Sequence, residues 1–388
     1  MKVILGCDPL LQPLTGIGNY TYRLGLGLKE SKEVSDLRLF AHGKFFSLGL
    51  LEPQKITDSD NTINQEGITS KIRRVLASST IIVKVYQLLL PLINRIALQN
   101  FSQYIYHSPN FILPNFEGKK IVTIHDLSTI RFPEYHPKAR VAFINKAIAD
   151  AIEVADHIIT DSEFVRSEIV ELYGVNLDNI TAIGLGADSY FKPRNVNECA
   201  EVLSSYEIEF GQYFLFVSTI EPRKNIENLL DAYILFRKKN RCKYPLILIG
   251  GKGWNNERIF EKISSLEAKG WVKYLGYLPQ NHIPLIYSGA RALLFPSTYE
   301  GFGLPVLEAM QSGIPVMTSI NSSMSEITQD KALLIDPQNI EAIVKAIVEL
   351  ATNDELVGQL SAGGIERSRD FSWDIKVKKT LDIYKKLS

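Results

Sequence analysis

The sequence is poor in several features that would assign a protein to a simple functional class. Its 388 residues include only three cysteines, Cys7, Cys199 and Cys242, which form no Cys-x-x-Cys pair and no Cys/His cluster with zinc spacing. This sparse set excludes a disulfide scaffold and is typical of a reducing compartment. The formal net charge is zero, with 43 basic and 43 acidic side chains, which argues against a globally basic nucleic-acid-binding protein.

Long apolar runs and internal repeats are also missing. The most apolar long window, residues 80–97, is interrupted by Lys84, Pro91 and Arg95, so it does not predict a transmembrane helix. No segment of about 20 to 50 residues repeats. The composition, 45% hydrophobic and 22% charged, is that of a globular protein. At roughly 150 residues per domain, the length predicts two or three domains.

Short apolar segments alternate with amphipathic segments along the chain. Helices are predicted between the strands, for example at 139–154, 226–238 and 340–352. This alternation predicts parallel sheets covered on both faces, and two series of strands predict two doubly wound, Rossmann-like domains of the α/β class. The predicted strands are 3–7, 37–40, 104–107, 121–124, 157–160 and 180–183, followed by 213–217, 246–249, 272–275, 292–295, 315–318 and 332–335.

A polar, proline-bearing segment at 191–195 separates the two series. It predicts an N-terminal domain at 1–190 and a C-terminal domain at 206–372, with a last helix at 373–388 that crosses back to the first domain. Ligands of doubly wound folds bind beyond the carboxyl ends of the strands. Two facing domains of this kind therefore predict a ligand cleft between them.

Two short motifs follow strands of the first series. Gly16-Ile17-Gly18 lets the backbone approach a ligand and leads into a helix whose N-terminus suits a phosphate, although a plain strand-to-helix turn fits equally well. His125-Asp126 directly follows the predicted strand 121–124, where His125 is positioned to bind a substrate hydroxyl. A capped turn with a structural histidine is the simpler interpretation of that pair on its own.

Two more specific motifs follow strands of the second series. Arg223 and Lys224 stand before a predicted helix, where basic side chains oppose the helix dipole and therefore indicate an arriving anion such as a diphosphate. After the strand 292–295, a glycine-rich loop separates Glu300 from Glu308. Two carboxylates so placed are suited to accept hydrogen bonds from sugar hydroxyls. Two ordinary surface glutamates would leave the glycine content unexplained.

These motifs together resemble the retaining glycosyltransferases of family 4, which have the GT-B fold of two facing Rossmann-like domains. The Glu-x7-Glu element from Glu300 to Glu308 is the signature of that family. The segments 221–225, 250–254 and 275–277 resemble its bacterial mannosyltransferase-like branch, as does the N-terminal Thr15-Gly16-Ile17-Gly18. The resemblance spans nearly the whole chain and is weakest between about residues 45 and 105.

The resemblance implies a role for each motif residue. Glu300 holds the donor sugar through its hydroxyls, Glu308 binds the nucleotide ribose, and His125 lies beside the sugar at the reacting side. Arg223 and Lys224 neutralise the leaving diphosphate. The other donor-binding residues that the resemblance implies are Gly16, Ile17, Gly18, Phe302, Gly303 and Leu304.

The implied reaction moves mannose from GDP-mannose to a growing, lipid-linked polysaccharide or oligosaccharide such as an O-antigen. Retention is expected through front-side displacement, in which the leaving phosphate takes the acceptor proton. A UDP-hexose is the alternative donor. A sugar-nucleotide 2-epimerase and a non-catalytic sugar-nucleotide-binding subunit are the alternative classes. No Asp-x-Asp motif ends a strand and basic groups supply the positive charge, so we expect neither a metal ion nor another cofactor.

The window 67–116 contains no acidic residue. Apolar side chains interleave there with basic ones, a composition that suits an anionic membrane surface. We therefore expect a cytoplasmic protein that touches the inner face of the cytoplasmic membrane through this window, with no nucleic-acid partner. A helix packed in the core with a few solvated bases is the alternative. The basic residues are Lys71, Arg73, Arg74, Lys84 and Arg95.

Overall fold

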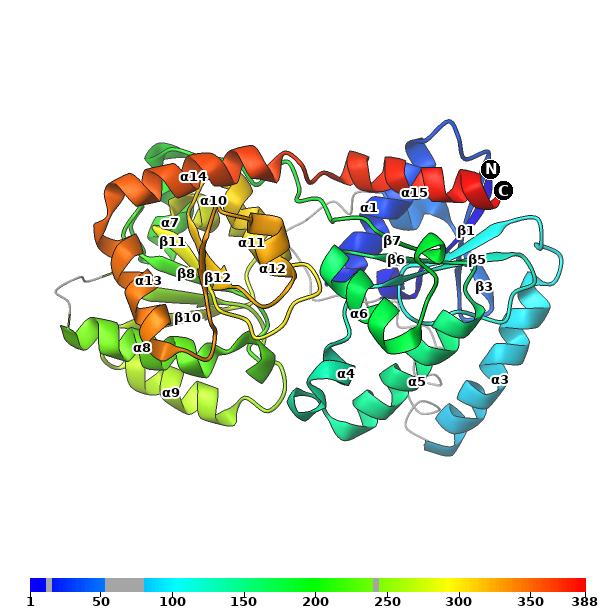
Figure 1. Cartoon of the computed structure of the whole chain (residues 1–388), viewed down its shortest axis with the longest axis horizontal. Helices are drawn as coiled ribbons and strands as arrows, with labels where there is room; N and C mark the ends of the chain where they lie inside the picture. The colour runs from blue at the N-terminus through cyan, green and yellow to red at the C-terminus, as the bar shows by residue number, and fades with distance from the viewer. Residues whose placement is uncertain (12–15, 53–79, 240–243) are drawn as a thin grey trace. The chain divides into compact units, whose positions relative to one another are not determined.

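The chain is an α/β protein built on two mainly parallel sheets (Figure 1). The structure is a computed structural model that describes residues 1–11, 16–52, 80–239 and 244–388, with only the backbone described at 80–88. The described chain divides into two compact units. The first comprises Met1–Thr123, Asp150–Ile158 and Lys379–Ser388, and the second comprises Ile124–Ala149 and Ile159–Lys378. The division into residues 1–190 and 206–372 stays a prediction.

The first sheet has seven strands in the order β3-β2-β1-β4-β5-β6-β7. Its pairs β1–β2, β1–β4 and β4–β5 are parallel. Ile4, Phe40 and Tyr106 pack together in one buried cluster beside it. The strands are β1 (Lys2–Gly6), β2 (Asp36–Ala41), β3 (Lys44–Phe46), β4 (Ile105–Ser108), β5 (Lys119–Ile124), β6 (His157–Thr160) and β7 (Ile180–Ala182).

The second sheet has six strands in the order β10-β9-β8-β11-β12-β13, and its paired strands are parallel. β9 and β11 are buried along their whole length, as the uninterrupted apolar runs of parallel strands require. β8 lies between β9 and β11, so the winding of the sheet reverses between β8 and β11. The strands are β8 (Phe214–Val217), β9 (Leu246–Ile249), β10 (Val272–Gly276), β11 (Ala292–Phe295), β12 (Val316–Ser319) and β13 (Leu333–Ile335).

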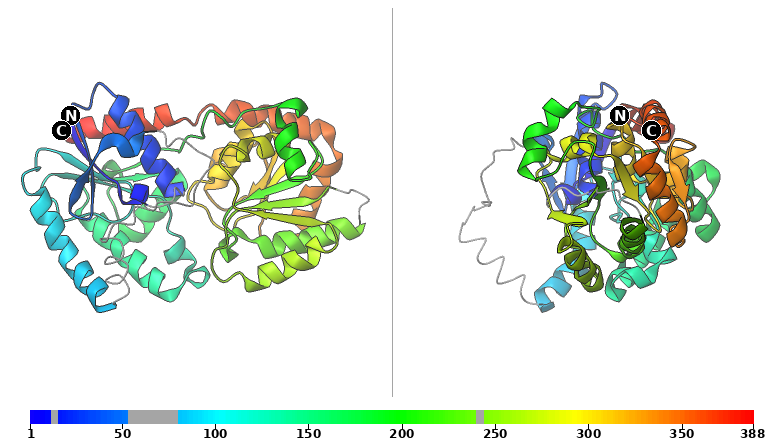
Figure 2. Two further views of the ribbon diagram at one scale, coloured as in Figure 1. Left: turned by 180° about the vertical axis from the view of Figure 1, so that it is seen from behind. Right: turned by 90° about the vertical axis from the view of Figure 1, so that its left-hand side faces the viewer.

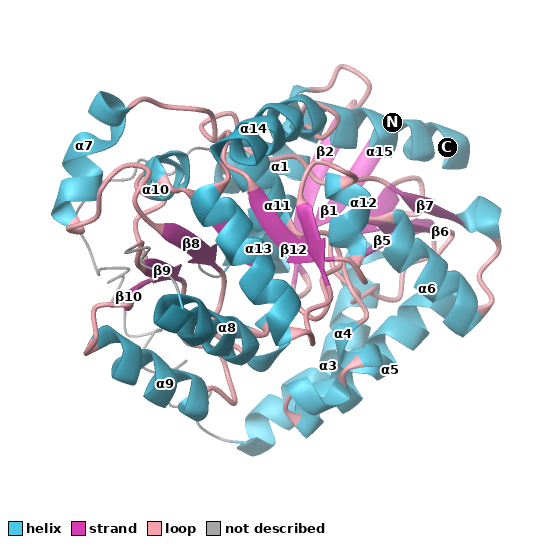
Figure 3. Cartoon of the chain, turned by 60° about the vertical axis from the view of Figure 1, so that its left-hand side comes forward, coloured by secondary structure: helices cyan, strands magenta, loops and turns pink. Residues whose placement is uncertain are grey.

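Helices cover both faces of the second sheet (Figures 1, 2 and 3). On one face α8 packs against α9 and α13, and on the other α11 packs against α10, α12 and α14. The helices of the described chain are α1 (Gly16–Glu30), α3 (Thr80–Leu98), α4 (Ser128–Arg131), α5 (Lys138–Val154), α6 (Glu163–Tyr173), α7 (Val196–Ser205), α8 (Ile226–Lys239), α9 (Glu257–Glu267), α10 (Ile283–Gly289), α11 (Leu304–Gln311), α12 (Ser323–Thr328), α13 (Ile340–Thr352), α14 (Asp354–Ser368) and α15 (Trp373–Leu387). Short 3₁₀ helices are η1 (Asp8–Leu11), η2 (Leu48–Leu51), η3 (Pro133–Tyr135), η4 (Leu177–Asn179) and η5 (Pro222–Lys224).

Each predicted strand is present, with ends that differ by no more than two residues. β3 was not predicted, and it departs from the parallel arrangement because it pairs with β2 in the antiparallel direction. The two strands are joined by His42 and Gly43, whose φ angles are 49° and 77°. Two consecutive left-handed residues form the tight hairpin turn that matches strand twist, and a His-Gly pair is a weak signal for it.

The end of α15 packs in the first unit. The hydroxyl of Tyr384 lies 2.6 Å from Nδ1 of His107 on β4, and Nε2 of the same ring lies 2.9 Å from the hydroxyl of Thr123. Among the residues that the structure describes, no helix has the length and apolar character needed to cross a membrane.

Candidate functional site

The candidate site lies where the loops that follow β8 and β11 meet, at the point where the winding of the second sheet reverses. Ligands of doubly wound sheets bind at this point, in the crevice outside the carboxyl ends of the strands. Asn225 fixes the first loop to its neighbours: it adopts a left-handed conformation, with φ 57°, and donates to the carbonyl oxygens of Pro296 at 3.1 Å and Pro337 at 2.7 Å. The two side chains before it, Arg223 and Lys224, contact the loop that follows β11.

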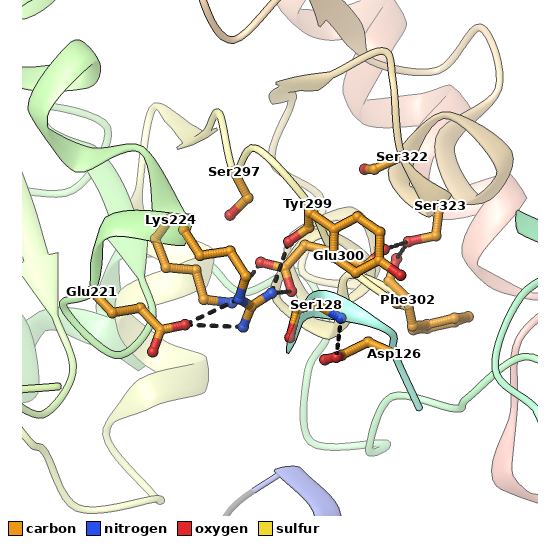
Figure 4. Close-up of polar contacts among 12 residues, drawn as sticks. Asp126, Ser128, Glu221, Lys224, Ser297, Tyr299, Glu300, Phe302, Ser322 and Ser323 are labelled. Carbon is orange, nitrogen blue, oxygen red and sulfur yellow. Dashed lines mark hydrogen bonds and ion pairs between the residues drawn. The ribbon is translucent and has the colours of Figure 1, made fainter. Parts of the chain in front are cut away.

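Both carboxylate oxygens of Glu300 are bound by the basic pair (Figure 4). Oε1 lies 2.5 Å from Nζ of Lys224, and Oε2 lies 3.0 Å from a terminal nitrogen of Arg223. The other terminal nitrogen of Arg223 lies 3.0 Å from Oε1 of Glu221. The side chains of all four residues are at most 12% exposed. The structure thus brings together three of the predicted residues in one buried charge cluster.

The charges of Lys224 and Arg223 determine the protonation state of Glu300. Burial alone would raise the pKa of Glu300, but the charges of Lys224 and Arg223 outweigh it and lower this pKa to about 2. Burial would lower the pKa of Arg223, but the carboxylates of Glu300, Asp126 and Glu221 raise it. At neutral pH Glu300 is therefore ionised and can only accept hydrogen bonds, for example from sugar hydroxyls.

The loop that carries Glu300 is held through its backbone carbonyls. The hydroxyl of Ser323 lies 2.7 Å from the carbonyl oxygen of Glu300 and 2.9 Å from that of Phe302 (Figure 4). Ser162 donates to the carbonyl of Gly301 at 2.7 Å. Arg223 donates to the carbonyl oxygen of Tyr299, the residue before Glu300, at 2.7 Å. A backbone bound at successive carbonyls keeps the Glu300 side chain in place before any ligand binds.

A buried tyrosine ties the same loop to the elements that follow β5 and β6. The hydroxyl of Tyr299 donates to Glu168 at 2.5 Å and accepts from the backbone nitrogen of Leu127 at 3.0 Å. Arg131 donates to the other oxygen of Glu168 at 2.7 Å. Because Tyr299 directly precedes Glu300, this network helps to set the position of Glu300.

His125 and Asp126 lie beside this loop. The Asp126 carboxylate accepts from the backbone nitrogen of Ser128 at 2.9 Å, which is the capped turn that the sequence pattern favours (Figure 4). His125 instead directs Nδ1 to the carboxylate of Asp161 at 2.5 Å, and its side chain keeps 16% of its surface exposed. The two residues of the pair therefore have different roles.

Glu308 lies on α11, apart from the ion pairs of Glu300. Its surroundings shift the pKa of its carboxyl group in the opposite direction. Burial raises its pKa to about 8; the nearby Tyr287 hydroxyl opposes the rise, and the charge of Asp188 adds to it. The two carboxylates of the Glu-x7-Glu element therefore differ in protonation at neutral pH. Acids whose pKa values are shifted in opposite directions are frequent at functional sites.

Glu308 predicts a measurable pH dependence of stability. Its pKa is about 8 in the folded chain against a reference value of 4.5, so between these values the folded state holds a proton that the unfolded state has lost. The free energy of unfolding must then fall as the pH rises through this window, by at most about 1.4 kcal/mol per pH unit. Urea unfolding at pH 5.5 and 7.5 should show a smaller fall for Glu308→Gln than for the unaltered chain. Equal falls would contradict the assignment.

The remaining predicted residues divide between the two units. Gly16, Ile17 and Gly18 begin α1 in the first unit. Gly303 is the N-cap of α11 with φ 106°, and Leu304 is the first residue of that helix. Phe302 is buried against the ring of Phe371. Thr15 lies outside the described residues. Within the described ranges no group of three or more His, Cys, Asp and Glu side chains has the arrangement of a metal site.

Several site residues escaped the sequence analysis. Asp161 directly follows β6 just as His125 follows β5, so the rule that ligand-binding residues follow parallel strands would have found it. Glu168 and Lys376 lie on helices far along the chain, and no local pattern marks them. Ser162 and Ser323 act through hydroxyl contacts to backbone, which a sequence does not reveal.

Comparison with known proteins gives results that agree with this geometry. The family model of the group 1 glycosyl transferases matches residues 206–367. The chain is 38% identical over 387 residues to the O-antigen chain mannosyltransferase B of Escherichia coli, with 100% of both chains covered. It is 26% identical to the O-antigen chain mannosyltransferase RfbU of Salmonella typhimurium, with 86% of each covered. The sucrose-phosphate synthase of Thermosynechococcus elongatus shares the fold, with a TM-score of 0.72, 18% identity and coverage of 100% of this chain and 99% of that one.

Proposed function

We propose that this chain, which belongs to the group 1 glycosyl transferases, moves mannose from GDP-mannose to a growing O-antigen chain. The proposed transfer retains the configuration of the sugar. The observation that carries this proposal is the buried cluster of Glu300 with Arg223 and Lys224. The full-length similarity to an O-antigen mannosyltransferase supports the choice of sugar and acceptor.

The cluster has charges of both signs, as the reaction requires. Cleavage of a sugar phosphate bond develops negative charge on the phosphate and positive charge on the sugar. Arg223 offers a planar fork and Lys224 a point charge to the leaving diphosphate, and Glu300 remains ionised beside them. Both cations are already paired in the cluster, so the diphosphate must share them with Glu300 rather than bind to free charges.

The other residues complete the proposed binding of the donor. Glu300 accepts hydrogen bonds from hydroxyls of the mannose, and His125 contacts the same sugar. Glu308 binds the ribose hydroxyls. The backbone at Phe302 and Leu304, around the left-handed Gly303, approaches the phosphates at the start of α11. No carboxylate of the cluster is free to act as a covalent nucleophile, which favours front-side displacement.

A donor screen tests the proposal. The purified chain is incubated with a lipid-linked acceptor mimic and GDP-mannose, UDP-glucose or UDP-N-acetylglucosamine, and products are analysed by mass spectrometry. Transfer from GDP-mannose with an α-linkage by NMR is expected. Transfer only from a UDP-sugar would replace the donor, and binding without transfer from any donor would indicate a non-catalytic subunit.

We also propose that the reaction needs no divalent metal ion, because Arg223 and Lys224 supply positive charge at the diphosphate. Transfer rates should be equal in EDTA and in magnesium or manganese. A loss of transfer in EDTA that magnesium restores would contradict this proposal.

Peripheral contact with an anionic membrane at the cytoplasmic face is a further part of the proposal. Four apolar side chains on α3, Leu89, Leu92, Ile93 and Ile96, are between 37% and 58% exposed. Their spacing places them on one face of the helix. Arg95 beside them is exposed, with Glu117 at 3.9 Å. An exposed apolar stripe with a basic side chain beside it favours a lipid surface. The bases Lys71, Arg73 and Arg74 lie outside the described residues, as does the Lys84 side chain.

A charge placed on this stripe should release the chain from membranes. Ile96→Asp introduces a carboxylate that anionic lipid repels and that cannot enter the acyl boundary, so flotation with anionic vesicles should fall several-fold. Leu177→Asp is the matched control, because Leu177 lies on η4 and is also 58% exposed. Equal flotation of the unaltered chain with neutral and anionic vesicles, or equal losses in both variants, would count against the proposal.

A further inference from the structure

A buried carboxylate orients His125. β5 and β6 are neighbours in the first sheet, and His125 and Asp161 are the residues that directly follow them. Nδ1 of the imidazole lies 2.5 Å from Oδ2 of Asp161, whose side chain is 2% exposed. An ionised carboxylate can only accept a hydrogen bond, so Nδ1 must carry a proton. In the neutral ring Nε2 is then an acceptor.

The second oxygen of this carboxylate is also occupied. Lys376, on α15, has a fully buried side chain, and its Nζ lies 3.0 Å from Oδ1 of Asp161. The same nitrogen donates to the carbonyl oxygen of Ile183 at 2.6 Å. A lysine is rarely buried to this extent unless its charge is paired. Asp161 therefore cannot rotate away from His125 without breaking a buried ion pair.

The ion pair also controls the charge of the imidazole. A lone buried carboxylate at Nδ1 would favour the doubly protonated ring, in which Nε2 is a donor. Lys376 places a second cation beside Asp161, which weakens the preference for the doubly protonated ring. The result is an imidazole whose orientation is fixed through Nδ1.

We propose that Asp161 and Lys376 are positioning residues that hold His125 in the Nδ1–H form, so that Nε2 accepts a hydrogen bond from a hydroxyl of the transferred sugar. The inference rests on the proposed function for the identity of that ligand. The arrangement of the three side chains is a property of the chain itself and is open to measurement without any substrate.

The first experiment measures the form of the ring. Long-range ¹⁵N–¹H spectra of the unaltered chain, with the signal assigned by its loss in His125→Gln, should show the proton on Nδ1 of His125. Asp161→Asn should move it to Nε2. Lys376 can only donate, so the new amide must turn its oxygen to Lys376 and its NH₂ to Nδ1. A proton on Nε2 in the unaltered chain, or no change in Asp161→Asn, would overturn the proposal.

The second experiment measures transfer. Asp161→Asn should lower kcat/KM about 10- to 100-fold, because an acceptor at the sugar has become a donor. Adding Lys376→Met frees the amide to turn its oxygen to Nδ1, so the double variant should recover activity. In the His125→Ala background, Asp161→Asn should cause no further loss. A further loss of similar size there, or no recovery in the double variant, would show a merely structural role.

The two experiments separate this inference from the proposed function. If the unaltered chain transfers no sugar from any donor, the proposed function fails, and the spectra of His125 still decide whether Asp161 and Lys376 fix the ring.

Discussion

Glu300→Gln is expected to lower kcat/KM for mannosyl transfer by about 10²- to 10³-fold, the usual effect of removing one preorganised charge from a reacting centre. The substitution keeps the size of the side chain and removes the charge that both Arg223 and Lys224 contact. Initial rates over a range of GDP-mannose concentrations would measure the change. Unaltered kinetics would contradict the assignment of Glu300 to the site.

The same substitution should also lower stability, and a second variant measures how much of the lost stability depends on the Lys224 charge. Breaking a buried ion pair from one side costs about 3–5 kcal/mol because a buried charge is left without its partner. Glu300→Gln combined with Lys224→Met also removes the Lys224 charge but leaves Arg223, so the free energy of unfolding should recover in part. Transfer should stay low, because Lys224 is itself proposed to bind the diphosphate. If activity returns together with stability, the role of Glu300 is structural.

The ionisation of Glu300 gives this variant a signature in acid. Its pKa is about 2 in the folded chain and 4.5 in the reference state, so its contribution to stability is present above pH 4.5 and is lost as the pH falls towards 2. This contribution is at most about 3 kcal/mol. Acid unfolding of Glu300→Gln should therefore be shallower over this window than that of the unaltered chain.

Gly301→Ala is expected to have the second large effect. A Cβ at this position would lie 1.9 Å from the carbonyl oxygen of His125, so two backbone segments must separate. Because no side-chain rotation can relieve the overlap, we expect a loss of at least about 2 kcal/mol in the free energy of unfolding. A displacement of His125 from Glu300 by about 1 Å should also lower kcat on the order of 10²-fold.

Gly251→Ala is the matched control for this prediction. A Cβ at Gly251 would meet no atom within 4 Å, so the same chemical change should leave stability and transfer nearly unaltered. Urea unfolding and transfer rates of the two variants would be measured side by side. Equal behaviour of Gly251→Ala and Gly301→Ala would show that the contact with His125 has no consequence.

The local pattern was sufficient for the parallel strands because each is a short apolar run between turn residues. The same applies to α13, whose apolar spacing and Asn339 cap mark both its face and its start. The hairpin to β3 was missed because its turn uses His42 before Gly43, a pair that occurs in many kinds of loop. Elements with strong periodicity are therefore predictable, whereas a hairpin defined by backbone angles is not.

The candidate site separates in the same way. Arg223, Lys224, Glu300 and His125 were predictable from their positions after apolar strands, since the fold brings strand ends together. Their protonation and orientation were not, because these depend on Asp161, Glu168 and Lys376, which approach from other elements. The electrostatic interaction between two groups depends on their distance in space and on their burial, not on their separation along the chain. Local sequence thus determines which groups can take part in the chemistry, and packing determines which of them are charged, which are held, and which hydrogen bonds they can make.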